Sequence, residues 1–139
     1  MQLHKLTEQL SVAAQISPED MADLAAAGFR SVINNRPDGE ARDQPASALL
    51  AATAAEHGLD YRYLPVVPGQ LSDEAAADFA DALRNLPAPV LAFCRTGTRS
   101  TSIWALQAAG DADAILGVAR QAGYDLASLR PRLLARTGR

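Results

Sequence analysis

Short apolar runs and longer amphipathic segments alternate along the chain. Four runs have the length and the apolar or alternating pattern of β-strands, and they cover residues 10–16, 29–35, 59–66 and 88–93. The segments between and after these runs are rich in alanine and leucine, as helices are, and they cover residues 17–28, 45–58, 71–86, 100–110, 111–124 and 126–136. Because strands and helices follow each other in turn, the pattern predicts an α/β fold. We expect one three-layer domain with a mostly parallel sheet and helices on both of its faces.

Two of the predicted helices carry clear start signals. Ser17 is placed to cap the first helix, with Pro18 at its first position. Ser72 is placed to cap the third helix, and Asp73 and Glu74 follow it in the first turn, where acidic side chains suit the positive end of the helix dipole. These signals support the helix assignments on either side of the predicted strands.

The all-apolar run over 88–93 is typical of a central parallel strand that helices cover on both faces. Sheets of this kind bind ligands at the carboxyl ends of their strands. The chain's only cysteine, Cys94, directly follows this run. We therefore expect Cys94 at the place in the fold where a site forms.

The composition narrows the function classes. With 139 residues, of which 48% are hydrophobic and 21% charged, the chain fits one globular domain over residues 1–139. Its net charge is −3 and it contains one lysine, so no broad basic face is available for nucleic acid. No apolar run is long enough to span a bilayer, and the amino end lacks the apolar core of a signal peptide. We therefore expect a cytoplasmic protein that binds neither nucleic acid nor membranes.

No metal and no cofactor are expected. One cysteine and two histidines far apart in the sequence give no spacing for metal ligands and no internal disulfide. The chain also lacks the Gly-x-Gly-x-x-Gly and Walker-type patterns of nucleotide sites. The segment around Cys94 is therefore the main candidate for chemistry.

The segment after Cys94 reads Cys-Arg-Thr-Gly-Thr-Arg-Ser and leads into a predicted helix. In that arrangement, successive backbone N–H groups and the helix N-terminus converge beside the sulfur, where they favour the reactive thiolate and bind anions. Arg95 and Arg99 add positive charge, and Gly97 allows the positive φ that a tight loop needs. Hydroxyl donors for a substrate come from three further residues of the loop, Thr96, Thr98 and Ser100.

Each of these residues has an ordinary structural interpretation when taken alone, as a turn glycine, a helix cap, a surface arginine or a small buried cysteine. The order of strand, cysteine, glycine-containing loop and helix is what favours catalysis. We therefore predict Cys94 as the nucleophile and Arg99 as a catalytic arginine, with Arg95 and the other loop residues binding the substrate. Arg36 is a further candidate for substrate binding, and a position in a surface turn is the commoner explanation for it.

The segments FCRTGTRS, VINNRPDGE and YRYLPV together resemble the phosphatase-like domain that accompanies β-lactamase-fold hydrolase-like proteins in bacteria. The resemblance covers about residues 9–110. It implies the fold of the dual-specificity protein phosphatases, with a mostly parallel sheet of four or five strands. It also implies that Cys94 lies at the base of an anion-binding loop.

The loop is similar to that of a second family as well. Its order Cys-Arg-x-Gly-x-Arg matches the rhodanese pattern, whereas cysteine phosphatases usually show His-Cys-x5-Arg. Here Phe93 precedes the cysteine, and Arg99 follows it one position earlier than in that phosphatase pattern. A shorter loop should form a tighter cradle, which suits a sulfane sulfur better than a phosphoryl group.

The general acid is a second departure from the phosphatase pattern. Dual-specificity phosphatases place an aspartate shortly after the strand that YRYLPV resembles, and this chain has VPGQLSDE there. Asp73 and Glu74 in that segment are better explained as the first turn of a helix. Asp38 and Glu40 in RPDGE are the alternatives, with Asp38 as the candidate general acid, and a turn explains both equally well.

Two mechanisms therefore remain open. The loop pattern and the missing acid favour a sulfurtransferase, in which Cys94 accepts sulfur from thiosulfate or glutathione persulfide and passes it to a thiol or cyanide. The overall resemblance favours a phosphatase that forms a cysteinyl-phosphate. A module that binds an anion or sulfane sulfur without turnover is the third alternative. The expected ligand is a small anion (thiosulfate, a persulfide or a phosphate ester), and the expected protein partner is a persulfide dioxygenase or another sulfide-oxidising protein.

Overall fold

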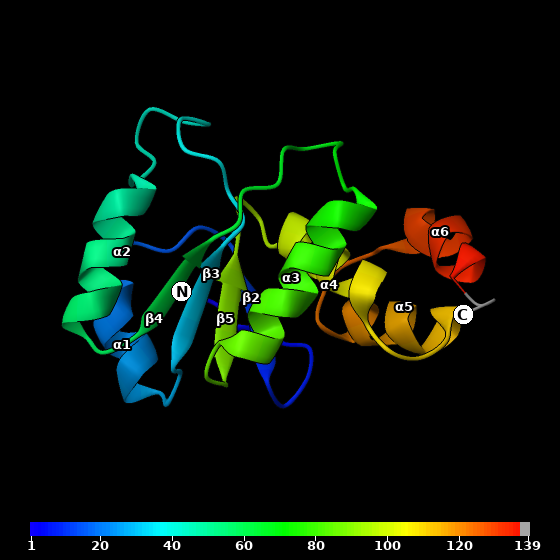
Figure 1. Cartoon of the computed structure of the whole chain (residues 1–139), viewed down its shortest axis with the longest axis horizontal. Helices are drawn as coiled ribbons and strands as arrows, with labels where there is room; N and C mark the ends of the chain where they lie inside the picture. Colours follow the sequence, from blue (N-terminus) through cyan, green and yellow to red (C-terminus); the bar gives the residue numbers. More distant parts are fainter. Residues whose placement is uncertain (137–139) are drawn as a thin grey trace.

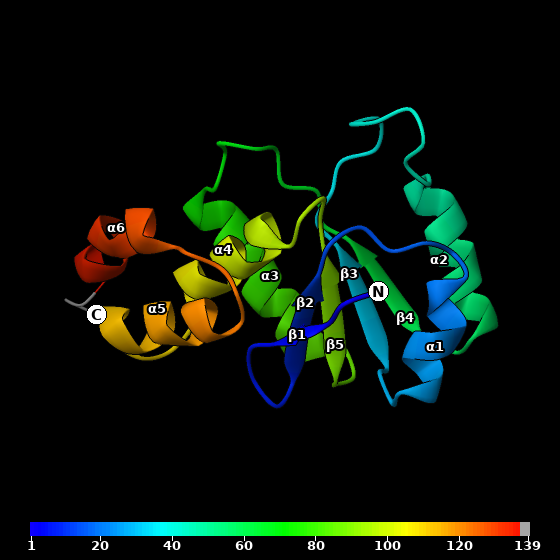
Figure 2. The same cartoon turned by 180° about the vertical axis from the view of Figure 1, so that it is seen from behind.

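The computed structural model describes residues 1–136, which form one five-stranded sheet between two groups of helices (Figure 1). The strands are β1 (His4–Lys5), β2 (Leu10–Ala13), β3 (Ser31–Asn34), β4 (Asp60–Tyr63) and β5 (Val90–Phe93). They lie in the order β1-β2-β5-β3-β4. All neighbouring pairs are parallel except β1 with β2, at the edge visible in Figure 2. The predicted α/β fold with a mostly parallel sheet is confirmed.

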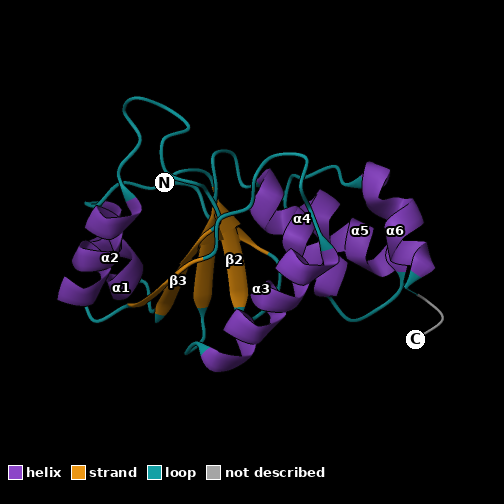
Figure 3. Cartoon of the chain, turned by 45° about the horizontal axis from the view of Figure 1, so that its top comes forward, coloured by secondary structure: helices purple, strands orange, loops and turns teal. Residues whose placement is uncertain are grey.

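Helices cover both faces of the sheet (Figure 3). One face carries α1 (Asp20–Ala26) and α2 (Ser47–Glu56). The other carries α3 (Asp73–Asn85) and α4 (Thr98–Gln107). Outside α4 lie α5 (Ala112–Gln121), the 3₁₀ turn η1 (Ala127–Leu129) and α6 (Arg130–Ala135). As a result α4 is enclosed on several sides, and its residues 100–106 are all buried.

The central strands are buried on both faces because successive side chains of a strand point to opposite sides of the sheet. The register partners Val32 and Leu91 pack with Leu50 of α2 in one apolar cluster. The next pair along the same strands, Ile33 and Ala92, belongs to the second cluster, which the helices α3 to α6 complete. These two clusters fix the carboxyl ends of β3 and β5, where the candidate site lies.

The structure differs from the sequence predictions mainly at the ends of elements. Strand β1 has two residues, too few for any periodic pattern, and it was not predicted. The predicted Ser17 cap is wrong, because α1 begins at Asp20 and its carboxylate accepts the backbone N–H of Ser17 (2.9 Å). Ser72 does cap α3 as predicted, since its side chain accepts the N–H of Ala75 (3.0 Å).

Candidate active site

Cys94 lies where β5 ends between two parallel neighbours. Its backbone N–H donates to the carbonyl of Ala13 at the end of β2 (3.4 Å). On the other side, the N–H of Asn35 donates to the carbonyl of Phe93 (2.8 Å). The Cys94 side chain is fully buried (0% exposed) and forms no disulfide. The sheet therefore holds the backbone of Phe93 and Cys94 from both sides.

The loop after Cys94 returns to the sulfur. The backbone N–H of Gly97 donates to the Cys94 Sγ atom at 3.1 Å. Gly97 is the N-cap residue of α4, and its φ of 94° lies in the left-handed region that glycine adopts at low cost. The N-terminus of a ten-residue helix thus begins beside the sulfur. Both the N–H donor and the positive end of the helix dipole therefore lie at the sulfur atom, an arrangement that binds anions.

Neighbouring elements hold the loop in place. The Thr101 hydroxyl donates to the carbonyl of Gly97 (2.8 Å), and the Tyr124 hydroxyl donates to the carbonyl of Thr96 (3.2 Å). Tyr124 also fills the space beside Gly97, because a Cβ atom added there would lie 2.8 Å from Tyr124 Cζ. Burial, and then the charge of Cys94, raise the pKa of Tyr124. Sequence reasoning missed Tyr124, since it follows Thr96 by 28 positions and no local pattern marks it.

Arg99 lies beside Cys94 with both terminal nitrogens engaged. Its Nη1 donates to Glu40 Oε2 (2.7 Å) and to the carbonyl of Val66 (2.9 Å), while its Nη2 donates to Glu40 Oε1 (2.8 Å). The side chain is only 13% exposed. The hydrogen bond with Glu40 raises the pKa of Arg99, burial opposes this, and the charge of Cys94 adds to the rise. Arg99 therefore connects the cysteine loop to the loop that carries Glu40.

Glu40 is the acidic side chain that the fold brings to the arginines. Besides the two bonds from Arg99, its Oε1 accepts a hydrogen bond from Arg36 Nε (3.0 Å). These donors, Arg99 first and Arg36 after it, hold the pKa of Glu40 at about 2 in spite of partial burial. The Glu40 carboxylate is therefore ionised at neutral pH.

Arg36 is a buried arginine that contacts the same carboxylate as Arg99. Its side chain donates to Gln15 Oε1 (3.0 Å) as well as to Glu40, and its backbone N–H donates to Asn34 Oδ1 (2.8 Å). The residue is 5% exposed. Its interpretation as part of a surface turn is therefore wrong, and its guanidinium lies with that of Arg99 on the same carboxylate.

The other predicted loop residues fall into two groups. Arg95, Thr96 and Thr98 are exposed at the mouth of the loop, where the Thr96 hydroxyl donates to that of Thr98 (3.1 Å). Ser100 is fully buried, and its hydroxyl donates to Asn35 Oδ1 (2.8 Å), which ties the start of α4 to the end of β3. The substrate contacts of these residues stay predictions, and Ser100 already has a partner within the fold.

Asp38 is engaged away from the two arginines. Its Oδ1 accepts the backbone N–H of Ser47, the first residue of α2 (2.8 Å), and its own N–H donates to the Tyr63 hydroxyl (2.9 Å). The role of general acid stays a prediction for Asp38, and these contacts place its carboxylate at the start of α2. The acid that contacts Arg99 is Glu40.

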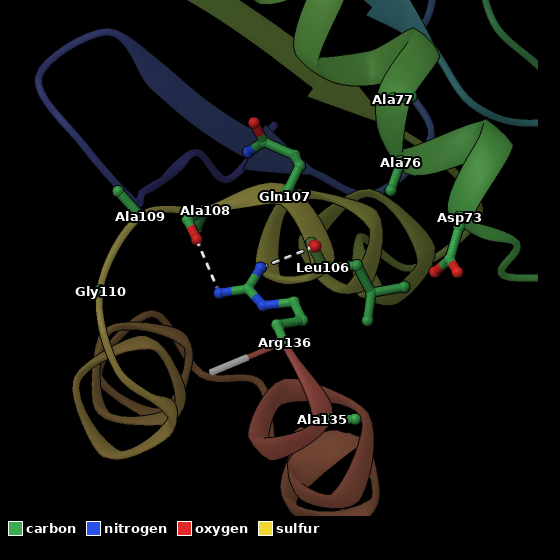
Figure 4. A pocket seen from close by; sticks show the side chains of 10 residues that line it. All are labelled: Asp73, Ala76, Ala77, Leu106, Gln107, Ala108, Ala109, Gly110, Ala135 and Arg136. Atoms are coloured by element: carbon green, nitrogen blue, oxygen red, sulfur yellow. Dashed lines mark hydrogen bonds between the residues drawn. The ribbon is translucent and has the colours of Figure 1, made fainter. Parts of the chain in front are cut away.

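A separate hollow of about 660 Å³ lies between α3, the end of α4 and α6 (Figure 4). There Arg136 caps the C-terminus of α4, because its side chain donates to the carbonyls of Ala105 (3.1 Å), Leu106 (2.7 Å) and Ala108 (2.8 Å). Neither a cysteine nor a histidine is among the lining residues. No residue of the Cys94 loop lines this hollow.

Within residues 1–136, none of the helices has the length and apolar character needed to cross a membrane. The same residues contain no group of three or more histidine, cysteine, aspartate or glutamate side chains placed to hold a metal ion. The expectations of a cytoplasmic location and of catalysis without a cofactor stay predictions.

A sequence comparison decides the family. A family model described as "Beta-lactamase hydrolase-like protein, phosphatase-like domain" matches residues 2–111. The chain belongs to this family. A β-lactamase hydrolase-like protein from Xylella fastidiosa (strain Temecula1) is 30% identical over 130 residues, which cover 91% of this chain and 30% of that relative. The chain thus spans less than a third of the length of this curated relative.

Solved structures confirm the predicted fold. A candidate phosphatase from Neisseria meningitidis Z2491 superimposes with a TM-score of 0.87 at 30% identity, covering 100% of this chain and 99% of that one. A kinase-associated phosphatase whose catalytic-site cysteine is replaced by serine superimposes with a TM-score of 0.69 at 14% identity, covering 94% and 85% of the two chains. At that identity the second match shows the fold alone. The phosphatase-like domain has the scaffold of the cysteine phosphatases.

Proposed function

We propose that this phosphatase-like domain hydrolyses phosphate monoesters, with Cys94 as the nucleophile. The observation that carries the proposal is the Cys94 Sγ atom, which accepts the Gly97 N–H at 3.1 Å at the start of α4. The family and the fold add support, because both are phosphatase-like. They favour phosphoryl transfer over the sulfur transfer that the loop pattern alone favoured.

In the first step, the thiolate of Cys94 attacks phosphorus in line with the leaving oxygen. An S–P bond forms, the P–O bond to the leaving group breaks, and the electron pair of that bond goes to the leaving oxygen. Backbone N–H groups of the loop and the guanidinium of Arg99 stabilise the negative charge on the phosphoryl oxygens. Arg99 is suited to this task because its planar fork binds two oxygens at once.

In the second step, water attacks the phosphorus of the cysteinyl-phosphate. The S–P bond breaks, its electron pair returns to the sulfur, and inorganic phosphate forms with loss of a proton to the solvent. Covalent catalysis of this kind divides one difficult displacement into two easier ones. The contacts that stabilise the thiolate before the reaction also make it a good leaving group in this step.

Protonation of the leaving oxygen is the step that this site supports least. The segment 67–70, just after the residue that contacts Arg99, contains no acid. Acid catalysis contributes about 10²–10⁴-fold where it operates. We therefore expect activity on aryl esters, whose leaving groups are stable as anions, and much lower rates on alkyl esters.

The test uses p-nitrophenyl phosphate as substrate. Wild-type protein should release p-nitrophenol, and Cys94→Ser should lower kcat by about 10³-fold or more, because the hydroxyl is a far weaker nucleophile. Calorimetry should detect binding of inorganic phosphate to Cys94→Ser. This binding would show that the variant is folded and that its loop is intact. Equal rates for wild type and Cys94→Ser would overturn the proposal.

Sulfur transfer is the second candidate, and the pattern Cys-Arg-x-Gly-x-Arg at residues 94–99 favours it. In this reaction the thiolate attacks the outer sulfur of thiosulfate, the S–S bond breaks, and sulfite leaves without needing a proton. A thiol or cyanide then takes the sulfur from the cysteine persulfide. A persulfide dioxygenase is the partner that this chemistry would suit.

Mass spectrometry separates the two candidates. After incubation with thiosulfate or glutathione persulfide, a sulfurtransferase gains one sulfur atom on Cys94, and Cys94→Ser gains none. Phosphatase turnover without this adduct supports the first proposal and excludes the second. If neither reaction occurs and phosphate still binds, the domain is the non-catalytic anion-binding module.

A further inference from the structure

The sulfur of Cys94 and the hydroxyl of Tyr124 contact opposite ends of one peptide group. The carbonyl of Thr96 and the N–H of Gly97 belong to the same planar unit. Its N–H donates to Cys94 Sγ (3.1 Å), and its carbonyl accepts a hydrogen bond from the Tyr124 hydroxyl (3.2 Å). This peptide bond is trans, so its carbonyl and its N–H point in opposite directions. The orientation of the carbonyl therefore sets the direction in which the N–H points.

This peptide group needs a constraint from outside the loop because a glycine follows it. Rotation of a peptide plane changes ψ of the residue before it and φ of the residue after it, and glycine adopts both signs of φ at similar cost. Gly97 has a φ of 94°. The two bonds from Thr101 to the Gly97 carbonyl fix the next peptide group along the chain. The hydroxyl of Tyr124 supplies the constraint on the 96–97 group.

Tyr124 is itself held by two other elements. Its backbone N–H donates to the carbonyl of Ala119 in the last turn of α5 (2.9 Å). Its ring packs against the apolar cluster around α4 and meets the His4 ring of β1 edge-on, with the ring centres 5.6 Å apart. Burial raises the pKa of Tyr124, so the hydroxyl keeps the proton that it donates. A donor of fixed position therefore lies beside the Thr96 carbonyl.

The hydrogen bond at the carbonyl also strengthens the donor at the other end of the peptide group. A carbonyl that accepts a hydrogen bond is polarised, and this polarisation makes the attached N–H a better donor. The Gly97 N–H faces the sulfur, which in the proposed reaction bonds to phosphorus and later leaves it. A donor at this atom stabilises the state in which sulfur departs with its electron pair.

We propose that Tyr124 is a positioning residue for the nucleophile, and that its hydroxyl fixes the 96–97 peptide group with the N–H directed at Cys94 Sγ. This inference rests on the proposed phosphatase reaction. Tyr124 acts through the peptide group and takes no part in bond breaking. Loss of its hydroxyl should therefore slow the formation and breakdown of the cysteinyl-phosphate, and it should leave the binding of the substrate oxygens unchanged.

The experiment compares the wild type with Tyr124→Phe, which keeps the ring and removes the hydroxyl. NMR measures hydrogen exchange of the Gly97 amide. The amide of Thr101 is the internal reference, because it donates to the Gly97 carbonyl (3.0 Å) in the first turn of α4. In Tyr124→Phe, exchange at Gly97 should be about tenfold faster and exchange at Thr101 should be unchanged. With p-nitrophenyl phosphate, kcat should fall by about tenfold while KM stays within about twofold.

Thr53→Val is the matched control, because it removes a hydroxyl that also donates to a main-chain carbonyl, that of Leu49 in α2 (2.9 Å). It should change neither exchange at Gly97 nor kcat. If either quantity is unchanged in Tyr124→Phe, this inference is overturned while the phosphatase proposal stands. Faster exchange at both Gly97 and Thr101 would also overturn it, since the whole start of α4 would then be loosened. If the wild type hydrolyses no phosphate ester, the phosphatase proposal fails, and the exchange rates still decide whether Tyr124 orients the peptide group.

Discussion

The two loops that meet at the site are held in opposite ways. The loop after β5 is fixed through its main chain, because the carbonyls of Arg95, Thr96 and Gly97 each accept a hydrogen bond from another part of the chain. The loop after β3 is fixed through side chains, above all through the Glu40 carboxylate. Main-chain acceptors carry no titratable charge, whereas the bonds to Glu40 depend on its carboxylate being ionised. One loop therefore positions Cys94 through uncharged groups, and the other is held by an ion pair that depends on pH.

Replacing Arg99 removes the side chain that connects the two loops and should have the largest effect on kcat/KM. Arg99→Lys keeps the positive charge and loses the two-pronged contact, so kcat/KM should fall by about 10²-fold. Arg130→Lys, at the exposed pair with Asp113, is the matched control and should leave the rate unchanged. Steady-state kinetics with p-nitrophenyl phosphate provide the measurement. A comparable fall in both variants would show that the fork of Arg99 has no special role.

A pair of glycines sharpens the comparison between the loops. Gly97 and Gly39 both have positive φ, at 94° and 83°, but only Gly97 has a neighbour that fills the space of a Cβ atom. Gly97→Ala should lower the free energy of unfolding by roughly 1–3 kcal/mol and reduce turnover, since it combines backbone strain with a collision against Tyr124. Gly39→Ala should cost about 1 kcal/mol or less, from φ alone. Urea unfolding of both variants tests this, and similar losses in the two would contradict it.

Substitutions of Asp38 separate its structural role from acid catalysis. Asp38→Ala removes the acceptor for the Ser47 N–H and should destabilise the protein by about 1 kcal/mol, while Asp38→Asn keeps that acceptor and should be nearly neutral. Neither variant should show the fall in kcat of about 10²–10⁴-fold that the loss of a general acid typically causes. If Asp38→Asn is stable but slow, the predicted acid role is restored.

The pH dependence of the free energy of unfolding should show the smallest effect, and this effect reports on Glu40 alone. The pKa of Glu40 is about 2 in the folded protein and 4.5 as its ordinary value. A lowered folded pKa means that the contribution of Glu40 is fully present above about pH 4.5 and is lost as the pH falls towards 2. Glu40→Gln should therefore be more destabilising at pH 6 than at pH 3, as measured by urea unfolding. A difference that does not change with pH would mean that Arg99 and Arg36 do not stabilise the carboxylate.

The sequence predicted those parts of the site that depend on local order. Cys94 and Gly97 belong to one continuous strand, loop and helix, and each of these elements has its own periodic or turn signal. Glu40 and Arg36 lie in a segment that reads as an ordinary turn, and the sequence did not show that Arg99, 59 positions after Glu40, would reach it. Contacts of that separation depend on the strand order, which brings β3 beside β5 and which the hydrophobic pattern does not specify.

The mixed composition of α4 also limited the prediction. Ser100, Thr101 and Ser102 are buried although they are polar, since the helix lies between the sheet and three other helices. A pattern based on apolar spacing locates such a helix correctly and cannot tell that all its sides are covered. The role of these hydroxyl groups depends on partners elsewhere in the chain, as in the hydrogen bond from Ser100 to Asn35.

The contacts of Tyr124 extend the folded domain beyond the last residue that the family model matches. The family match ends at residue 111, whereas Tyr124 and the apolar side chains of α5 and α6 come later and complete the cluster around α4. A truncated protein that stops at residue 111 would retain Cys94 and Arg99 yet expose one side of the helix that begins at the sulfur. Expression trials, and comparisons with longer relatives, should treat these last helices as part of the working unit.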